Sequence, residues 1–451
     1  MSSRNGFDGI IKALEQLGYR RHPAVPVIGC RGSKACWRVR GDYWLAGRFE
    51  KNTLSRLIRR HFDVFLDLDN HHVVFHRIPA PTGEYAVEVF AHAVRIGVLE
   101  YGSKGWILHP SGALASVLAS IGANYLQASS DKGRRLKGKK LRLGGEACNR
   151  KDWVLVGTDK WIGPAKVIDK ENCIVKIKDL APLGFKPLSP SEIDEAVEAN
   201  TEIIGALASE AREFIRRVYA RFQASRGKLY VAFSGGADST ALLELAREAV
   251  GGGNVVAVYV DTGMEHPETK AYVEKIVSII GVDLEVVSAK LDPVELIARQ
   301  GFMTRDNRWC TRLLKLEPLK EFYEKHGVRL VLDGARKWES TTRAKTPRLG
   351  ENPLIPGVVR ALPIYHWPRL AVQLFLAERN LPVNQLYNEG LVRIGCMACP
   401  AMHLYELHIS YRNHKDWFYR LAEKIAGSTK DDVINTLATI LRGRWRYGVS
   451  G

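Results

Sequence analysis

A loop of small and polar residues, Ser234-Gly-Gly-Ala-Asp-Ser-Thr240, has the composition of a phosphate-binding turn. The apolar run 228–233 before it predicts a β-strand, and residues 241–250 after it have helical periodicity. Glycines let backbone N–H groups approach phosphate closely, and the helix N-terminus adds its positive end. We expect the hydroxyl groups of the last two loop residues to be free. The candidate nucleotide-binding residues are Ser234, Gly235, Gly236, Asp238, Ser239 and Thr240.

A second apolar run, residues 255–260, predicts another strand that ends in Asp261-Thr-Gly263 and leads into a helix. This β-α-β-α order predicts parallel strands joined by right-handed crossovers. Ligands then bind beyond the carboxyl ends of the strands, where both polar loops fall. We expect Asp261, Thr262 and Gly263 to belong to the nucleotide site, with Asp261 contacting ribose or magnesium. The alternative is that Asp261 only caps the helix.

The complete pattern Ser-Gly-Gly-x-Asp-Ser resembles the signature of the PP-loop ATP pyrophosphatases, which usually bind a nucleotide and cleave between its α and β phosphates. The resemblance implies ATP and Mg²⁺ as ligands, with Asp238 as a catalytic residue that holds magnesium or orders the phosphates. Later blocks are similar to the phosphoadenosine phosphosulfate (PAPS) reductase family, a branch of this group. They occur in the family's order: Asp261–Thr269, Trp309–Lys315 with Pro318-Leu319, Gly334–Ser340 with Arg343, Pro363–Trp367 and Leu386–Cys396.

Three basic residues of these blocks are further candidates for catalysis. Guanidinium groups pair with phosphate or sulfate oxygens through two hydrogen bonds, which suits Arg336 and Arg343. Lys315 adds another positive charge. The alternative is a surface network of ion pairs with Glu339 and Glu317.

Three cysteines in two of the same blocks predict a shared ligand site, made by Cys310 and the pair Cys396-Met-Ala-Cys399. Soft thiolates suit a 4Fe-4S cluster that keeps one iron open, or a zinc ion to which His403 adds a fourth ligand. A redox pair or unligated thiols are the remaining alternatives. The other cysteines are expected to be ordinary buried thiols: Cys30, Cys36, Cys148 and Cys173. The alternative is that Cys30 and Cys36 are weak metal ligands.

The chain of 451 residues has 66 Lys and Arg against 49 Asp and Glu, a formal net charge of +17. Residues 1–186 contain 31 basic and 17 acidic side chains, whereas residues 187–451 contain 35 and 32. A basic module joined to a nearly neutral one predicts a polyanion as partner, and we expect RNA, in particular tRNA. The candidate RNA contacts are Arg134, Arg135, Lys137, Lys139, Lys140 and Arg142.

The order of a valine-rich strand, a glycine and then Ile-Gly-Pro-Ala, within Val154–Val167, resembles the PUA domain, a small RNA-binding β-barrel. Farther upstream, residues 63–77 predict a β-hairpin. A proline-rich linker followed by a capping box predicts a connector helix. We therefore expect a multidomain chain: a basic, unassigned α+β domain at 1–120, a PUA-like barrel at 121–186, a connector helix at 187–225 and a catalytic domain with a doubly wound parallel α/β sheet at 226–451.

The preferred hypothesis is that a base oxygen of RNA attacks the α-phosphorus of ATP, pyrophosphate leaves, and the adenylated base accepts sulfur. The second hypothesis is a reductase of PAPS or adenylyl sulfate (APS) that releases sulfite. No cysteine follows Cys399, so the chain lacks the C-terminal Glu-Cys-Gly-(Leu/Ile)-His segment of thioredoxin-dependent reductases. The third is an RNA-binding module with a regulatory nucleotide site, which five intact blocks argue against.

The sequence also bears on where the protein acts and with what it associates. No apolar run approaches the roughly 20 residues that span a bilayer, and residues 1–17 lack the apolar core of a signal peptide. We expect a cytoplasmic protein without a membrane partner. A sulfur-donor or electron-donor protein is a further expected partner.

Overall fold

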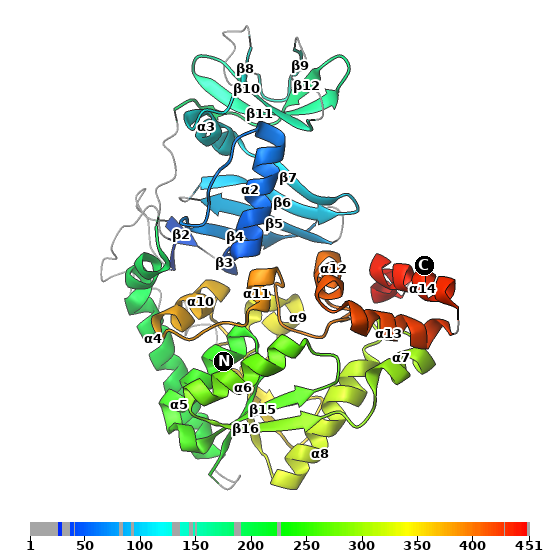
Figure 1. The fold of residues 1–451 in the computed structure, drawn as a ribbon. Helices are drawn as coiled ribbons and strands as arrows, with labels where there is room; N and C mark the ends of the chain where they lie inside the picture. The colour runs from blue at the N-terminus through cyan, green and yellow to red at the C-terminus, as the bar shows by residue number, and fades with distance from the viewer. Residues whose placement is uncertain are drawn as a thin grey trace. The chain divides into compact units, whose positions relative to one another are not determined.

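The computed structural model places the described residues in two compact units, one ending at Asn200 and one beginning at Thr201 (Figure 1). This boundary falls within the long helix α4 (Ile193–Arg221). Residues 1–17, which are predicted to lack the apolar core of a signal peptide, lie outside the described residues. The structure describes residues 26–28, 37–39, 41–80, 84–91, 94–128, 136–143, 148, 151–184, 191–222, 227–427 and 429–448.

The first unit is built on two larger sheets and a short parallel pair, β1 (Pro26–Ile28) with β2 (Trp37–Val39). One sheet is antiparallel and has the order β3 (Tyr43–Leu45), β4 (Val73–Ile78), β5 (Tyr85–Ala91), β6 (Val94–Gly102), β7 (Gly105–Pro110). The other has the order β8 (Leu126–Gln127), β10 (Trp153–Gly157), β11 (Trp161–Asp169), β12 (Ile174–Ile177), β9 (Lys140–Arg142), with β13 (Ala181–Pro182) on β11. Helices α2 (Arg48–Phe62) and α3 (Gly112–Ser120) pack on these sheets.

The hairpin predicted for residues 63–77 is wrong. Helix α2 ends at Asp63, whose φ of +57° turns the chain back on the helix. Leu66 and Leu68 are buried, and the hydroxyl of Ser55 in α2 donates to the Leu66 carbonyl at 2.7 Å. The apolar residues after Asp63 therefore pack against the helix, and β4 takes β3 and β5 as its partners instead.

The second sheet of this unit covers the region that resembles a PUA barrel. Strand β10 pairs with β11 as a hairpin, and a Cβ on Gly163 of β11 would lie 1.8 Å from the Asp179 carbonyl oxygen, so only glycine fits there. Among the described strands the pairing is an open path from β8 to β9. The PUA likeness therefore stays a prediction.

Cys148 and Cys173 form a disulfide bond in this sheet region, which corrects the expectation that both are ordinary thiols. Both residues are buried, and 25 positions separate them. Such a spacing carries no local signal, because only the tertiary fold brings the two together. The free thiols among the described residues are Cys310, Cys396 and Cys399, while Cys30 and Cys36 lie outside that part of the chain.

The predicted RNA contacts lie along β9 and the turn before it. Lys137 pairs with Asp179 at 2.9 Å, and Arg142 donates to Asn172 at 3.3 Å, so two of these side chains have acidic or amide partners. Lys139 and Lys140 are exposed. Arg134 and Arg135 lie outside the described residues.

The second unit contains a six-stranded mixed sheet with helices on both sides. Its order is β16 (Asp283–Ser288), β15 (Val255–Asp261), β14 (Leu229–Ala232), β17 (Leu330–Leu332), β19 (Val359–Ala361), β18 (Leu349–Glu351). All neighbouring pairs are parallel except β18 with β19. This is the expected doubly wound α/β fold with one antiparallel edge. The order reverses between β14 and β17, and ligands bind at such a switch point.

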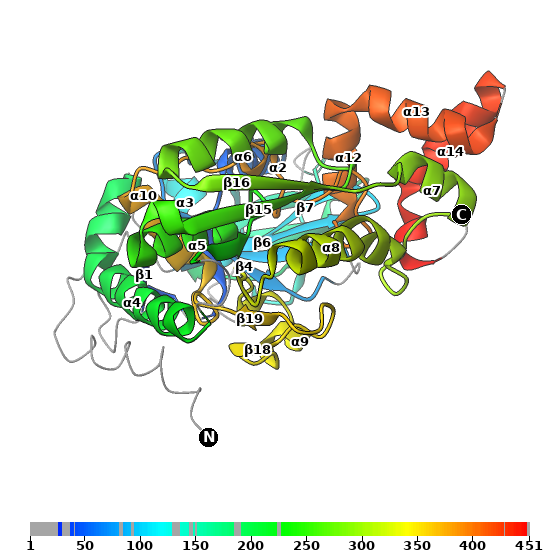
Figure 2. The ribbon, with the colours of Figure 1, turned by 90° about the horizontal axis from the view of Figure 1, so that it is seen from below.

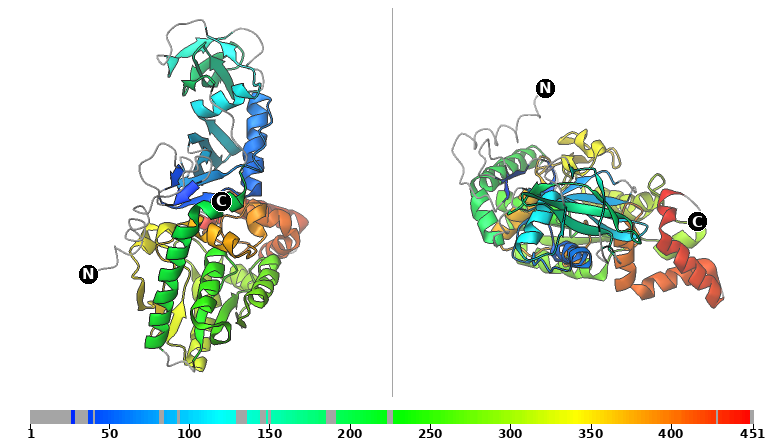
Figure 3. Two further views of the ribbon diagram at one scale, coloured as in Figure 1. Left: turned by 90° about the vertical axis from the view of Figure 1, so that its left-hand side faces the viewer. Right: turned by 90° about the horizontal axis from the view of Figure 1, so that it is seen from above.

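Helices cover this sheet and extend beyond it. Figure 2 shows α6 (Pro267–Ile280) and α8 (Glu317–His326) on opposite sides of β15 and β16, and Figure 3 shows α4 alongside α5 (Ala237–Val250). No described helix has both the length and the apolar sequence that crossing a bilayer requires. The remaining helical segments are η3 (Gly252–Asn254), α7 (Pro293–Gln300), η4 (Thr311–Leu316), η5 (Lys337–Glu339), α9 (Thr341–Ala344), α10 (Arg369–Glu378), α11 (Leu386–Glu389), α12 (Leu404–Asn413), α13 (Lys415–Ala426), α14 (Lys430–Arg442) and η6 (Arg444–Tyr447).

Candidate active site

The predicted phosphate loop connects β14 to the N-terminus of α5, as the sequence indicated. Gly235 has a φ of +73°, and a Cβ there would lie 2.9 Å from the Thr269 methyl group, so the turn requires glycine. Ser234 is exposed at the tip. Its backbone N–H donates to the Ser239 hydroxyl at 3.3 Å. Backbone amides and a helix N-terminus thus meet at the carboxyl end of the central strand.

The hydroxyl groups of Ser239 and Thr240 are not free, which corrects the sequence-based expectation. Each donates to the carbonyl of Gly236, at 2.9 Å and 3.0 Å respectively. Thr240 is fully buried, and its hydroxyl also lies 3.0 Å from the Tyr272 hydroxyl. Thr240 therefore supports the loop from behind rather than facing a ligand.

Asp238 is held by Arg336, which reaches it from the loop after β17. The Arg336 Nε donates to Asp238 Oδ1 at 2.9 Å, and its Nη1 donates to the Trp367 carbonyl at 3.3 Å. Arg336 is only 3% exposed, whereas the Asp238 side chain is 29% exposed, so a buried cation holds a carboxylate that solvent still reaches. A Cβ on Gly334 would lie 3.2 Å from the Asp238 carbonyl carbon, so glycine permits the two loops to come this close. The pair spans the switch point of the sheet.

The other two predicted catalytic cations lie apart from this pair. Arg343 is exposed on α9 and forms an ion pair with Glu339, which favours the surface-network alternative for this residue. Lys315 is exposed on η4, a π-helical turn. In the described part of the chain, neither side chain has a hydrogen bond or ion pair with the phosphate loop.

Tyr387 is a site residue that sequence reasoning missed, although its block was recognised. Its hydroxyl accepts a hydrogen bond of 3.1 Å from the Ala237 N–H, one of the amides that open α5. Burial raises the pKa of this phenol, so it is neutral at physiological pH. The buried Asn384 amide lies 3.4 Å from the Gly235 carbonyl and ties the same segment to the loop. The segment that leads to the cysteines is thus anchored on the phosphate loop.

The loop after β15 contacts the cysteine segment, residues 393–399, through Thr262, one of the predicted nucleotide-binding residues. Thr262 is buried, its N–H and hydroxyl both donate to Glu265 at 2.8 Å, and its hydroxyl lies 4.0 Å from Cys396 Sγ. Asp261 accepts from the Gly263 N–H at 3.0 Å and lies 3.4 Å from Lys270 Nζ. Asp261 therefore stabilises its own turn, and it does not cap α6, whose N-cap residue is His266.

The cysteine segment pairs with this loop through its backbone. Glu265 and Cys396 form an antiparallel bridge, and the Met397 N–H donates to the Met264 carbonyl at 2.8 Å. Burial raises the pKa of the Cys396 thiol well above its ordinary value, and the nearby Glu265, Cys399 and Cys310 add to the effect. An uncoordinated Cys396 is therefore protonated, and a bound metal would have to displace the proton.

Cys399 and Cys310 complete the predicted ligand set. Cys399 is buried, and its Sγ accepts a hydrogen bond of 3.0 Å from Arg393. Cys310 lies directly before the π-helical turn η4, and burial raises its thiol pKa. All three cysteines border one apolar cluster that includes Met264, Trp309 and Met402.

The spacing of the thiols bears on the expected zinc site. Tetrahedral zinc with bonds of about 2.3 Å holds sulfur atoms about 3.8 Å apart. In the described residues, the one group of three or more His, Cys, Asp or Glu ligand atoms that all lie within 4.8 Å contains no cysteine. The thiols are therefore too widely spaced for a preformed zinc site, and His403 does not close one.

Taken together, the doubly wound sheet, the glycine loop and the Asp238–Arg336 pair give this domain the fold of the PP-loop class. Residues 228–402 match the phosphoadenosine phosphosulfate reductase domain, and the chain belongs to this family through that region. The family resemblance noted in the sequence is confirmed.

Individual relatives extend this comparison. An uncharacterized protein of Methanocaldococcus jannaschii is 28% identical over 419 residues, which cover 90% of this chain and 95% of the relative. An adenosine 5′-phosphosulfate reductase of Deinococcus radiodurans is 28% identical over 220 residues, 48% of this chain and 82% of that enzyme. The crystal structure of PAPS reductase from Candida auris, a phosphate complex, is 21% identical, covers 47% of this chain and 98% of that chain, and gives a TM-score of 0.34.

Proposed function

We propose that residues 226–451 bind magnesium-ATP on the phosphate loop and catalyse adenylation, followed by thiolation, of an RNA base. The observation that carries this proposal is the complete loop Ser234–Ser239 at the switch point, with Asp238 fixed by Arg336. Asp238 Oδ2 has no hydrogen-bond partner among the described residues, and this oxygen is the one we assign to magnesium. ATP is the nucleotide for which an intact PP-loop is suited.

The chemistry follows from where these groups lie. A carbonyl oxygen of the base attacks the α-phosphorus of ATP, the bond from that phosphorus to the bridging oxygen breaks, and pyrophosphate leaves with magnesium. The α5 amides, the helix dipole and Arg336 neutralise the developing negative charge. A sulfur nucleophile then attacks the adenylated carbon, AMP leaves, and a C=S bond replaces C=O.

The cysteines provide the second part of the proposal. Cys310, Cys396 and Cys399 hold the 4Fe-4S cluster, which when bound supplies one iron with an open position for a sulfur ligand. Arg393 orients Cys399 through its 3.0 Å hydrogen bond to the sulfur atom. A Cβ on Gly236 of the phosphate loop would lie 4.0 Å from Ile394 Cβ, two residues before Cys396. This proximity supports a common site for the nucleotide and the sulfur chemistry.

In this proposal the basic residues 134–142 hold the RNA phosphates. Lys139 and Lys140 are exposed on or beside β9, where two point charges can neutralise phosphates of any sequence. An outside protein supplies sulfur or electrons in the cytoplasm.

The second candidate function is a sulfonucleotide reductase that converts APS or PAPS to sulfite. It is favoured by the likeness to the Deinococcus radiodurans enzyme, which is named an adenosine 5′-phosphosulfate reductase. Against it, the complete Ser-Gly-Gly-x-Asp-Ser pattern at Ser234–Ser239 favours ATP as the nucleotide.

One anaerobic experiment separates these functions. The protein is incubated with labelled ATP, magnesium and bulk tRNA, or with APS or PAPS and a reductant. Pyrophosphate release that depends on RNA supports adenylation, sulfite release supports reduction, and nucleotide binding without either product supports a regulatory site. Asp238→Asn should abolish the reaction. Asp283→Asn, at the opposite end of the sheet in an exposed pair with Lys228, should not.

A further inference from the structure

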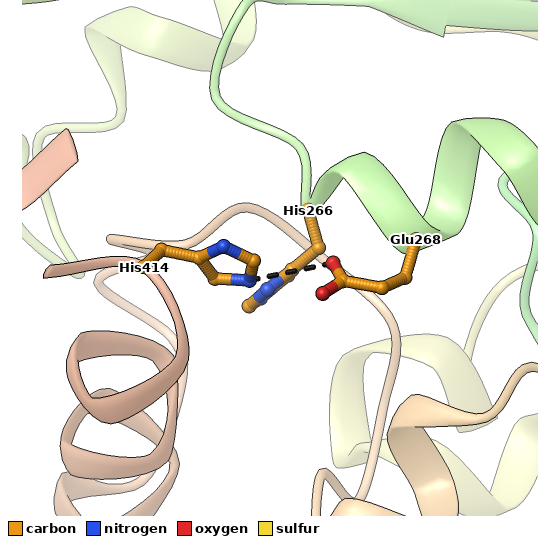
Figure 4. A group of neighbouring side chains, drawn as sticks. All are labelled: His266, Glu268 and His414. Carbon is orange, nitrogen blue, oxygen red and sulfur yellow. Dashed lines mark ion pairs between the residues drawn. The ribbon is translucent and has the colours of Figure 1, made fainter. Parts of the chain in front are cut away.

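A cluster of three side chains apart from the phosphate loop and the cysteines has the composition of a metal site (Figure 4). One ligand atom each from His266, Glu268 and His414 all lie within 4.8 Å of one another. His266 and Glu268 begin helix α6, and His414 lies between α12 and α13. We propose that this cluster binds a divalent transition-metal ion, zinc, through two imidazole nitrogens and one carboxylate oxygen.

The buried ligand atoms lack hydrogen-bond partners, which supports the proposal. His266 is 1% exposed, and its Nδ1 has no hydrogen-bond partner in the described part of the chain. The same holds for His414 Nε2 and Glu268 Oε2, both of which are buried atoms. Buried polar atoms are nearly always hydrogen-bonded, so an unpartnered buried atom in each of three residues whose ligand atoms cluster within 4.8 Å requires an explanation. A metal ion would satisfy all three at once.

The geometry around the cluster also fits a metal. His266 Nε2 lies 3.4 Å from the hydroxyl of buried Ser410, which leaves Nδ1 as the ligand nitrogen. Ligating imidazoles usually have their second nitrogen hydrogen-bonded in this way. His414 Nε2 and Glu268 Oε2 lie 3.3 Å apart without hydrogen-bond geometry. Tetrahedral zinc with bonds of about 2.0–2.2 Å places its ligand atoms about 3.3 Å apart.

The donor set selects the kind of ion. Two imidazoles and one carboxylate suit zinc, iron or copper, whereas magnesium and calcium prefer oxygen ligands alone. Three protein ligands leave a further coordination position for water or a substrate group. His266 also lines a cavity together with Cys396 and Cys399, so one proposed ligand borders the cysteine site. The competing explanation is a plain His414–Glu268 ion pair that joins α6 to α12.

Cobalt(II) titration tests the site, with the full-length chain in a Cys310→Ser, Cys396→Ser, Cys399→Ser background to remove competing thiolates. We expect one equivalent of cobalt with the ligand-field absorption of nitrogen and oxygen ligands. In the same background, His414→Gln should weaken affinity by roughly 100-fold or more, beyond the 10–100-fold cost of losing an outer hydrogen-bond partner. Zinc should displace the cobalt and bleach the absorption.

A matched histidine controls for nonspecific binding. His408→Gln removes an exposed histidine of the same helix region, whose Nε2 lies 2.9 Å from the Leu441 carbonyl, and should bind cobalt normally. If His414→Gln does not fold, Glu268→Gln provides the test instead, because this milder change should also remove the absorption. The proposal would be overturned if the protein with His266, Glu268 and His414 intact showed no cobalt absorption band. Equal cobalt affinity in the Glu268→Gln and His408→Gln proteins would also overturn it and leave the ion pair.

Discussion

Nε of Arg336 donates a hydrogen bond of 2.9 Å to Oδ1 of Asp238, although 98 positions separate the two residues in the sequence. The first belongs to the loop after β17 and the second to the first turn of α5. A single contact therefore joins the two sides of the switch point, where a nucleotide is expected.

Arg336→Ala should lower the free energy of unfolding by about 3 kcal/mol, because it leaves the Asp238 carboxylate partly buried without its cation. Nucleotide binding should be lost together with this pair. Arg343→Ala is the matched control, since its exposed ion pair with Glu339 is expected to contribute below about 1 kcal/mol. Chemical denaturation and calorimetric titration with ATP measure both effects. Equal losses in the two variants would contradict the assigned roles.

Tyr387→Phe should strengthen nucleotide binding. The phenol hydroxyl accepts the hydrogen bond of the Ala237 N–H, which a bound phosphate would also need. Removing the hydroxyl therefore frees this N–H for the phosphate. A hydrogen bond of about 1 kcal/mol corresponds to a roughly fivefold lower Kd. The free protein should lose stability by a similar amount. Tyr365→Phe deletes a hydroxyl bound to the Arg343 and Ala344 carbonyls and should leave the Kd unchanged. Weaker binding in Tyr387→Phe would show that the hydroxyl contacts the ligand directly.

Anaerobically purified protein should contain iron and inorganic sulfide and be brown. Cys396→Ser should remove the colour and most of the iron, because the cluster would lose one of three protein ligands. A Cys148→Ser, Cys173→Ser protein should keep both, since its cysteines belong to the disulfide of the other unit. Iron and sulfide analysis beside the visible spectrum measures this. Stoichiometric zinc without iron in the unsubstituted protein would refute the cluster.

Glu248→Gln should destabilise the second unit at neutral pH but not in acid. Burial raises the pKa of Glu248, but hydrogen bonds from Arg379 and Arg212 outweigh it and leave the pKa below the ordinary 4.5. The carboxylate therefore stabilises the fold above about pH 4.5, and this contribution is lost as the pH falls through the folded-state pKa.

The expected cost of Glu248→Gln at pH 7 is about 2 kcal/mol, the contribution of hydrogen bonds to a charged partner. Denaturation at several pH values measures it. Glu213→Gln, an exposed carboxylate on α4, should cost less than about 0.5 kcal/mol throughout. If Glu248→Gln lowered the free energy of unfolding as much in acid as at pH 7, the stabilising role assigned to the Glu248 carboxylate would be contradicted.

Local patterns predicted much of the second unit. The strand, glycine loop and helix at residues 228–250, the parallel order of the first strands and the family all followed from residue types at short spacing. Sequence could not show that Thr240 faces inward or that the Tyr387 hydroxyl reaches Ala237, because both depend on contacts between distant segments.

The first unit was harder to predict for the same reason. The alternation in residues 63–77 is compatible with a hairpin and with a chain that packs on its own helix. The Ser55–Leu66 contact decides in favour of the second arrangement. Glu265, Arg393 and the cluster of His266, Glu268 and His414 were also not singled out. The sequence blocks that contain these residues indicated the family. A role as a ligand, however, depends on which side chains lie close together in space, and spacing along the sequence does not show this.

The cross-link between Cys148 and Cys173 and the three thiols near the nucleotide loop respond in opposite ways to the same reagent. Dithiothreitol keeps Cys310, Cys396 and Cys399 reduced but also attacks disulfide bonds, and closing the 25-residue loop near β12 is worth about 3.5 kcal/mol. Handling conditions chosen to protect sulfur chemistry in one half of the chain therefore weaken the other half.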